Sequence, residues 1–221
     1  MNLGGKSGRA TKSTGTIGVM RVLRRYLDIG RSPVRADCIF VFAGRPDRKA
    51  FGLSLYRSGY ADQLVLSVAR FEWRGFAQLG LPDDGGLVEM VHRTPPVRRH
   101  FFVRLGPEGA TCVLVPIRRF GTWTEAAAIT AFAREKHIQN LLVVSTRSHL
   151  RRAMAALQAQ EGADVLSFHP VAARPDTATG DRDCDPDERS LLLAVELGKY
   201  ILYRMVAWAS WLRDAVRKRT R

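Results

Sequence analysis

The sequence has few cysteines, and they are widely spaced. Only Cys38, Cys112 and Cys184 occur among 221 residues, and consecutive cysteines lie more than 70 residues apart. An odd and dispersed set of this kind excludes a disulfide framework and lacks the paired spacing of a structural zinc site. We therefore expect a protein of a reducing compartment.

Long hydrophobic runs are missing as well. No apolar stretch follows the first basic residues, so we expect no secretory signal there. The most apolar long segment, 191–212, contains Glu196, Lys199 and Arg204, whose charges would be costly inside a bilayer. The segment is instead typical of an amphipathic helix, either packed on the domain or lying on a membrane surface.

Acidic residues are scarce at both ends of the chain. Residues 1–35 have eight Lys or Arg and one Asp, and residues 213–221 have five and one, so the two ends hold +7 and +4 of the net charge of +14. Residues 36–212 are close to neutral. The basic ends suit contact with an anionic membrane surface, and they equally suit solvated tails. Nucleic acid is disfavoured as a partner, because aromatic side chains are not interleaved with the basic ends and no recognition motif occurs.

The sequence does contain a regular alternation of strands and helices. Apolar runs at 37–43, 63–67 and 140–145 are typical of strands buried on both faces of a parallel sheet. A segment with apolar residues at helical spacing follows or precedes each of these runs. This alternation predicts an α/β fold with an open, mostly parallel, doubly wound (Rossmann-like) sheet. The predicted helices cover 48–58, 122–136 and 149–160, and a further strand is expected at 164–168.

The middle of the chain departs from this alternation. Residues 100–105 and 111–115 have the pattern of a hairpin around the turn 106–109. We place 113–117 in the main sheet, and 74–98 has no assignable pattern. The sequence predicts three segments. The first, 1–35, is basic and partly disordered, with disorder at 1–15 and a short helix at 17–27. The second is an α/β domain at 36–205 that ends in an acidic loop at 173–190 and a long helix, and the third is a basic helix end at 206–221.

Candidate functional residues fall where the predicted strands end, which is where doubly wound sheets bind ligands. Ser145 and Thr146 follow a buried strand and open a helix. Hydroxyls and free backbone N–H groups at a helix N-terminus form an anion site, and His149 and Arg152 share one helix face behind it. Ordinary helix capping with exposed charges is the alternative.

Two further clusters could line the same site. Thr122 and Glu125 have the spacing of a capping box, which would also explain both residues without any function. Gly44, Arg45 and Arg48 follow the first strand. Together the clusters would place cations and one carboxylate around a phosphate or carboxylate ligand, with His149 or Glu125 available for proton transfer.

Taken in order, these motifs resemble the bacterial YdcF-like (SanA/ElyC-like) family, a domain of largely unknown function with an open α/β fold. The resemblance covers roughly residues 36–205 with a gap at about 72–110. The resemblance implies that Ser67, at the end of the second strand, is a ligand-binding residue. Many members of the family are associated with the inner membrane and with envelope functions. The matching segments are Asp37-Cys-Ile-Phe-Val-Phe-Ala-Gly44, Arg48-x-x-x-Gly52-x-x-Leu55-Tyr56-x-x-Gly59, Leu64-Val-Leu-Ser67, Thr122-x-x-Glu125-Ala126, Leu141-Leu-Val-Val-Ser-Thr146-x-x-His149-x-x-Arg152-Ala153 and Glu196-x-x-Lys199-Tyr200.

We therefore expect a YdcF-like domain that binds an anionic, phosphorylated or nucleotide-like small molecule. The sequence identifies no reaction, no cofactor and no metal. The alternative is an interaction protein with a vestigial pocket, a cytoplasmic protein held by its basic ends on the inner face of the plasma membrane. The expected ligand-binding residues are Gly44, Arg45, Arg48, Ser67, Thr122, Ser145, Thr146 and Arg152, with His149 as the acid/base candidate and Glu125 as its partner.

Overall fold

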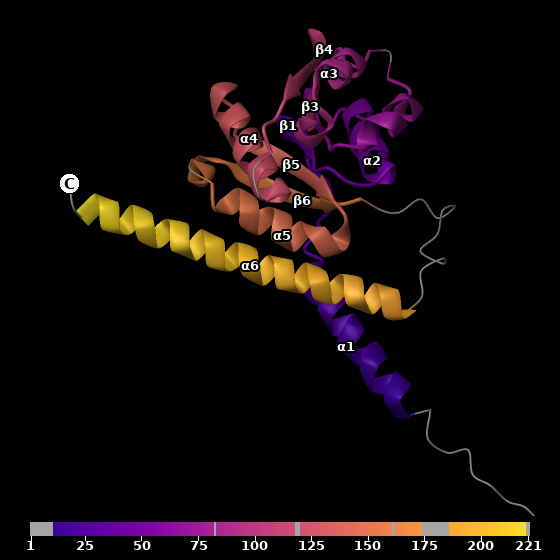
Figure 1. The fold of residues 1–221 in the computed structure, drawn as a ribbon, viewed down its shortest axis with the longest axis vertical. Coiled ribbons are helices and arrows are strands. Elements are labelled where there is room, and N and C mark those ends of the chain that lie inside the picture. Colours follow the sequence, from indigo (N-terminus) through magenta and orange to yellow (C-terminus); the bar gives the residue numbers. More distant parts are fainter. Residues whose placement is uncertain (1–10, 82, 118–119, 161, 174–185, 220–221) are drawn as a thin grey trace, which may run out of the picture.

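The computed structural model describes residues 11–81, 83–117, 120–160, 162–173 and 186–219. At its centre lies one six-stranded sheet with the strand order β4-β3-β2-β1-β5-β6 (Figure 1). The predicted α/β fold with a mostly parallel sheet is confirmed. The strands are β1 (Cys38–Val41), β2 (Gln63–Val68), β3 (Phe101–Gly106), β4 (Gly109–Leu114), β5 (Asn140–Ser145) and β6 (Ser167–Ala172).

The strand order reverses at β1. β1 pairs in parallel with β2 on one side and with β5 on the other, and β6 continues in parallel beyond β5. The chain fills the β2 side first and returns to the β5 side after the antiparallel β3–β4 hairpin. The carboxyl ends of β1 and β5 therefore meet at a topological switch point, where open α/β sheets bind their ligands.

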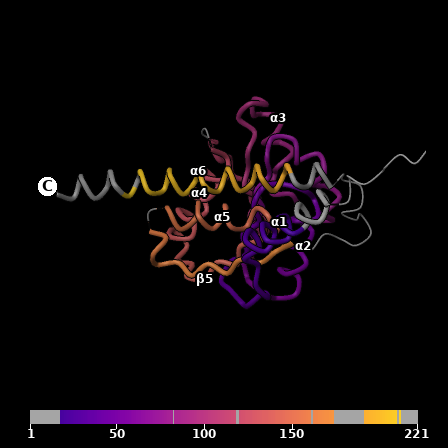
Figure 2. The backbone as a smooth tube through the Cα atoms, turned by 90° about the horizontal axis from the view of Figure 1, so that it is seen from below, coloured from indigo at the N-terminus to yellow at the C-terminus, as the bar shows by residue number. Residues whose placement is uncertain are grey.

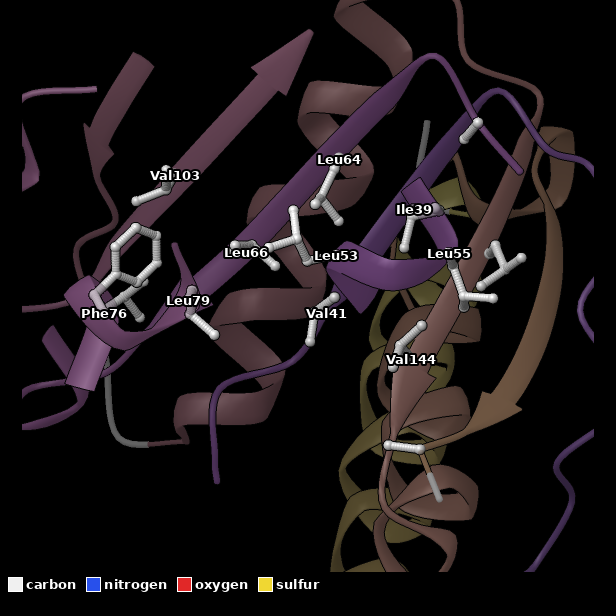
Figure 3. Close-up of a cluster of buried hydrophobic side chains, with 14 of the residues drawn as sticks. Ile39, Val41, Leu53, Leu55, Leu64, Leu66, Phe76, Leu79, Val103 and Val144 are labelled. Atoms are coloured by element: carbon white, nitrogen blue, oxygen red, sulfur yellow. The ribbon is translucent and has the colours of Figure 1, made fainter. Parts of the chain in front are cut away.

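Helices cover both faces of the sheet because side chains of buried strands alternate between the faces. Ile39 and Val41 of β1 pack toward α2 in one buried apolar cluster (Figure 3). Cys38 and Phe40 pack toward α4 and α5 in the other cluster. The first face has α2 (Pro46–Arg57) with η1 (Glu72–Leu79), α3 (Leu87–Arg93) and η2 (Pro96–Arg98), whereas the second has α4 (Gly121–Glu135) and α5 (Arg147–Gln158).

Two terminal helices form a further layer outside α5. α1 (Thr11–Leu27) and α6 (Pro186–Arg219) both pack on α5 and on each other. α6 runs across the body as one unbroken helix of 34 residues, about 50 Å long (Figures 1 and 2). The expected boundary at 206 therefore lies inside a continuous helix. Among the helices of the described ranges, none is long and apolar enough to cross a membrane.

Several predicted boundaries at the chain ends were wrong. α1 begins at Thr11, within the segment expected to be disordered, because extending a helix that is already nucleated costs little. α6 begins at Pro186, inside the expected acidic loop, and the rest of that loop beyond residue 173 lies outside the described residues. Residues 1–10 also lie outside them.

Two strand boundaries differ from the predicted ones because of the local backbone. β4 ends at Leu114 rather than 117, because Pro116 has no N–H group with which to continue the ladder. The last strand begins at Ser167, since residues 163–165 form the short 3-10 helix η3 after a left-handed Gly162. Its Pro170 is tolerated because β6 is an edge strand.

The segment at 74–98 that had no assignable pattern forms η1, α3 and η2 on the α2 side of the sheet. Its buried apolar side chains extend the cluster between α2 and the sheet, whereas its short helices are too brief for the sequence to show a clear period. The buried side chains are Phe76, Leu79, Leu87 and Val91.

Gly52 sets how closely α2 approaches β1. A Cβ atom at this position would lie 2.3 Å from Cγ2 of Val41. We expect Gly52→Ala to lower the free energy of unfolding by about 1–3 kcal/mol, because the steric overlap outweighs the better helix propensity of alanine. Urea denaturation measures this change.

Gly18 of α1 provides the control, because no atom lies within 4 Å of a Cβ atom built there. Gly18→Ala should leave the stability unchanged or raise it by up to about 1 kcal/mol. Equal stabilities of the two variants would contradict the close packing of α2 on β1.

Candidate functional site

Arg48 joins the carboxyl ends of β1 and β5. α2 begins directly after the turn that follows β1, so Arg48 in its first turn folds back over the strand end. Its Nη1 donates hydrogen bonds to the carbonyl oxygens of Phe42 (3.3 Å) and Ala43, and its Nη2 donates to Thr146 Oγ1 at 3.2 Å. The side chain is buried, and its Nε has no partner among the described residues.

Gly44 has no side chain, and the guanidinium of Arg48 occupies the space that a side chain would fill. Its φ of +147° lies in the region that disfavours other residues, and a Cβ atom there would lie 2.7 Å from the Arg48 guanidinium. The glycine after the first strand is therefore required by the position of Arg48.

Thr146 is the N-cap residue of α5, but its side chain does not cap the helix. Its Oγ1 accepts the hydrogen bond from Arg48, while its carbonyl oxygen accepts from the backbone N–H groups of His149 and Leu150. The N–H groups of Arg147 and Ser148 precede the first intrahelical bonds of α5. The helix N-terminus thus presents donors beside a buried guanidinium.

Glu125 belongs to a second polar cluster at the ends of β1 and β2. Its Oε1 accepts hydrogen bonds from Ser67 Oγ at 2.6 Å and from the backbone N–H of Ala43 at 2.9 Å. His100 Nε2 lies 2.8 Å from Ser67 Oγ and 3.6 Å from Glu125 Oε1. Since the Ser67 hydroxyl donates its proton to Glu125, the neutral His100 ring donates to Ser67.

Burial shifts the proton affinities of this cluster in opposite directions. Burial raises the pKa of Glu125, although the hydrogen bonds from Ser67 and Ala43 oppose this. Burial, together with the charge of Lys49, lowers the pKa of His100 to about 4. Both effects favour the uncharged forms, which is the expected response to a site with little water.

His149 and Arg152 form a third cluster between α4, α5 and α6. His149 Nδ1 bonds Ser145 Oγ, and its Nε2 lies 3.4 Å from Thr122 Oγ1. Arg152 Nη1 donates to the same Thr122 oxygen at 2.7 Å. Burial, reinforced by the charges of Arg152 and Arg48, lowers the pKa of His149, so the ring is neutral near pH 7.

Arg152 also holds α6. Its Nε and Nη2 donate to the two carboxylate oxygens of Glu196, at 2.9 and 3.3 Å. This two-pronged arrangement is the strongest form of a charged hydrogen bond. Arg152 therefore has its own counter-charge on α6.

The structure brings most of the expected site residues together, but their hydrogen-bond partners differ from those expected. Gly44, Arg48 and Thr146 form one group, Ser67 and Glu125 a second, and Thr122, Ser145, His149 and Arg152 a third. Glu125 bonds Ser67 and Ala43 rather than its expected partner His149. Arg45 has a largely exposed side chain, which lies 3.6 Å from Asp47.

Two residues of the site escaped the sequence analysis: Lys49 and His100. Lys49 is buried, donates to the carbonyl oxygen of Gly44 at 3.1 Å and forms an ion pair with Glu72 of η1. A lysine directly after Arg48 resembles an ordinary surface charge in the sequence. His100 precedes β3, whose register opposes Ser67 to Phe102, and this register does not follow from the local sequence pattern.

Comparisons with protein-family models, with curated proteins and with solved structures gave no match. The resemblance to the YdcF-like family therefore stays a prediction. In the described part of the chain, no group of three or more His, Cys, Asp or Glu side chains is placed to hold a metal ion.

His100 should make stability depend on pH. Its pKa is about 4 in the folded protein and about 6.5 in an unfolded chain, so between these values the unfolded chain binds more protons. The contribution of His100 is complete above pH 6.5 and falls by about 2–3 kcal/mol as the pH decreases toward 4. In His100→Gln, whose amide can still bond Ser67, the melting temperature should fall less steeply over this range. Equal slopes for wild type and variant would contradict the prediction.

Proposed function

We propose that the carboxyl ends of β1 and β5 bind a small anionic molecule, either phosphorylated or nucleotide-like. One observation carries the proposal: Arg48 is a buried cation without a carboxylate hydrogen-bond partner among the described residues, and it contacts the N-cap of α5. Phosphate groups bind where a helix N-terminus and an arginine act on the same position.

The charges around Arg48 support this proposal. The other two buried cations have carboxylate partners, since Lys49 pairs with Glu72 and Arg152 with Glu196. Burial lowers the pKa of the Arg48 guanidinium, although the charges of Glu125, Glu72 and Asp47 oppose this. An anion next to Arg48 would offset the cost of that burial.

The roles of the neighbouring residues follow from their contacts. Arg48 and the backbone N–H groups of Arg147 and Ser148 would hold the anion, with Thr146 fixing the position of the guanidinium. His149 has both ring nitrogens engaged, so in this proposal it positions Ser145 rather than touching the ligand. Glu125 is the group available for proton transfer, since burial raises its pKa toward neutrality.

The proposal includes a relation to the YdcF-like family and, through it, a role linked to the cell envelope. In support, the residues that resemble the family's motifs gather at adjacent strand ends. Ser67, Glu125 and Thr146 come from segments far apart in the sequence, yet each belongs to a polar cluster at the switch point or beside it. Proteins that share only a fold need not have these three residues at the strand ends.

Arg48→Met tests the proposal by isothermal titration with inorganic phosphate, AMP and adenosine. Wild type should bind phosphate and AMP but not adenosine, and AMP should bind more tightly if the ligand is nucleotide-like. Loss of charged hydrogen bonds should weaken binding roughly 10–100-fold in the variant.

Arg45→Ala is the matched control, because this nearby arginine has an exposed side chain and should leave affinity unchanged. Thr146→Val supplies a second variant if Arg48→Met does not fold, and should also weaken binding because it releases the guanidinium. The proposal fails if wild type binds neither phosphate nor AMP, or if Arg48→Met binds them as wild type does.

A further inference from the structure

The outward face of α6 is apolar and uncovered. The face of α6 toward α5 includes the buried side chains of Leu193 and Tyr203. On a helix of 3.6 residues per turn, the opposite face is formed by exposed apolar residues over about five turns. These are Leu191, Val195, Ile201, Leu202, Met205 and Trp208, which we call the outer stripe of α6.

The outer stripe is unusual for a helix on a protein surface. Met205 and Trp208 are 62% and 64% exposed, and between Leu191 and Trp208 no charged residue falls within the stripe. A surface helix normally turns its apolar side inward. α6 lies outside α5 on the side away from the sheet, and α1 extends beyond it (Figure 1). Contiguous exposed apolar surface of this kind marks an interaction site.

Basic side chains border the stripe on both sides. At 100° per residue, Lys199 falls at one border and Arg204 at the other. Glu196 is turned toward the body, where Arg152 and Lys199 bond it. Trp211, which lies five turns after Leu193 on the same side of the helix, is also exposed.

α1 brings the second basic end of the chain to the same helix. Tyr26 of α1 meets Tyr200 of α6 edge to face, with ring centroids 6.2 Å apart, and Arg151 of α5 lies over the Tyr26 ring. α1 has no acidic residue, and its arginines at 21, 24 and 25 are exposed. The basic helix α1 therefore adjoins α6 at Tyr200, in the N-terminal half of α6.

We propose that α6, assisted by α1, docks the protein on an anionic lipid bilayer, with α6 lying in the plane of the interface. An apolar stripe with basic borders is the pattern of an interfacial helix. Exposed tryptophans such as Trp208 suit the headgroup level of a bilayer. A second copy of the chain suits the stripe less well, because pairing two stripes would bring the basic borders of both copies together.

Vesicle co-sedimentation of the full chain tests this docking surface. The protein should bind vesicles of phosphatidylcholine mixed with phosphatidylglycerol at low salt, leave them at high salt, and bind pure phosphatidylcholine much less. Arg204→Gln should weaken binding roughly fivefold. The double variant Met205→Ser with Trp208→Ser should weaken it roughly tenfold or more.

The double variant Phe71→Ser with Val97→Ser is the matched control. Both residues are exposed apolar side chains, 63% and 78% accessible, and neither belongs to α1 or α6. This control should bind vesicles as wild type does.

Three outcomes would overturn the proposal. The first is equal sedimentation of wild type and the α6 double variant, and the second is binding that ignores salt and phosphatidylglycerol. The third is a wild-type dimer in light scattering that becomes a monomer in the Met205→Ser, Trp208→Ser variant, while vesicle binding stays unchanged. This result would assign the stripe to a second copy of the chain. Circular dichroism of the variants confirms that the exposed substitutions leave the fold intact.

Discussion

The guanidinium of Arg48 is the interaction on which the arrangement at the switch point depends. It bonds the carbonyl oxygens that end β1 and the hydroxyl that opens α5, so it fixes two crossovers of the sheet relative to each other. Two glycines make this possible. Gly52 lets α2 approach β1, and Gly44 leaves space for the guanidinium. The hydrogen-bond acceptors that hold this cation are neutral oxygens.

A continuous series of polar contacts leads from the strand end to the surface helix. Ser145 bonds His149, both His149 and Arg152 reach Thr122, and Arg152 pairs with Glu196 of α6. Because its members are buried, breaking any link would leave a polar group unsatisfied. α6 is therefore fixed to the domain at α5, the same helix that begins at the proposed anion site, and it is not a loosely attached tail.

The sequence was sufficient for the sheet but not for the pairing of side chains in the site. Strands such as 140–145 were predictable because they are apolar on both faces, and parallel order then placed Arg48 near Thr146. Strand ends were set by single residues such as Pro116. The Ser67–His100–Glu125 cluster joins three segments across the antiparallel hairpin, and neither the rotamers nor the register that bring them together follow from local pattern.

The orientation of α6 follows from how its inward face is stabilised. A helix attached only by apolar burial would turn its most apolar side to the core, leaving its charges in water. In α6 the inward face instead combines a few buried apolar side chains, such as Leu193, with the Glu196–Arg152 ion pair. That pair requires Glu196 to point inward, and the helical period then forces Ile201, Met205 and Trp208 outward. The partly buried Glu196–Arg152 pair, together with Leu193 and Tyr203, thus occupies the inward face of α6, and the apolar stripe faces away from the protein.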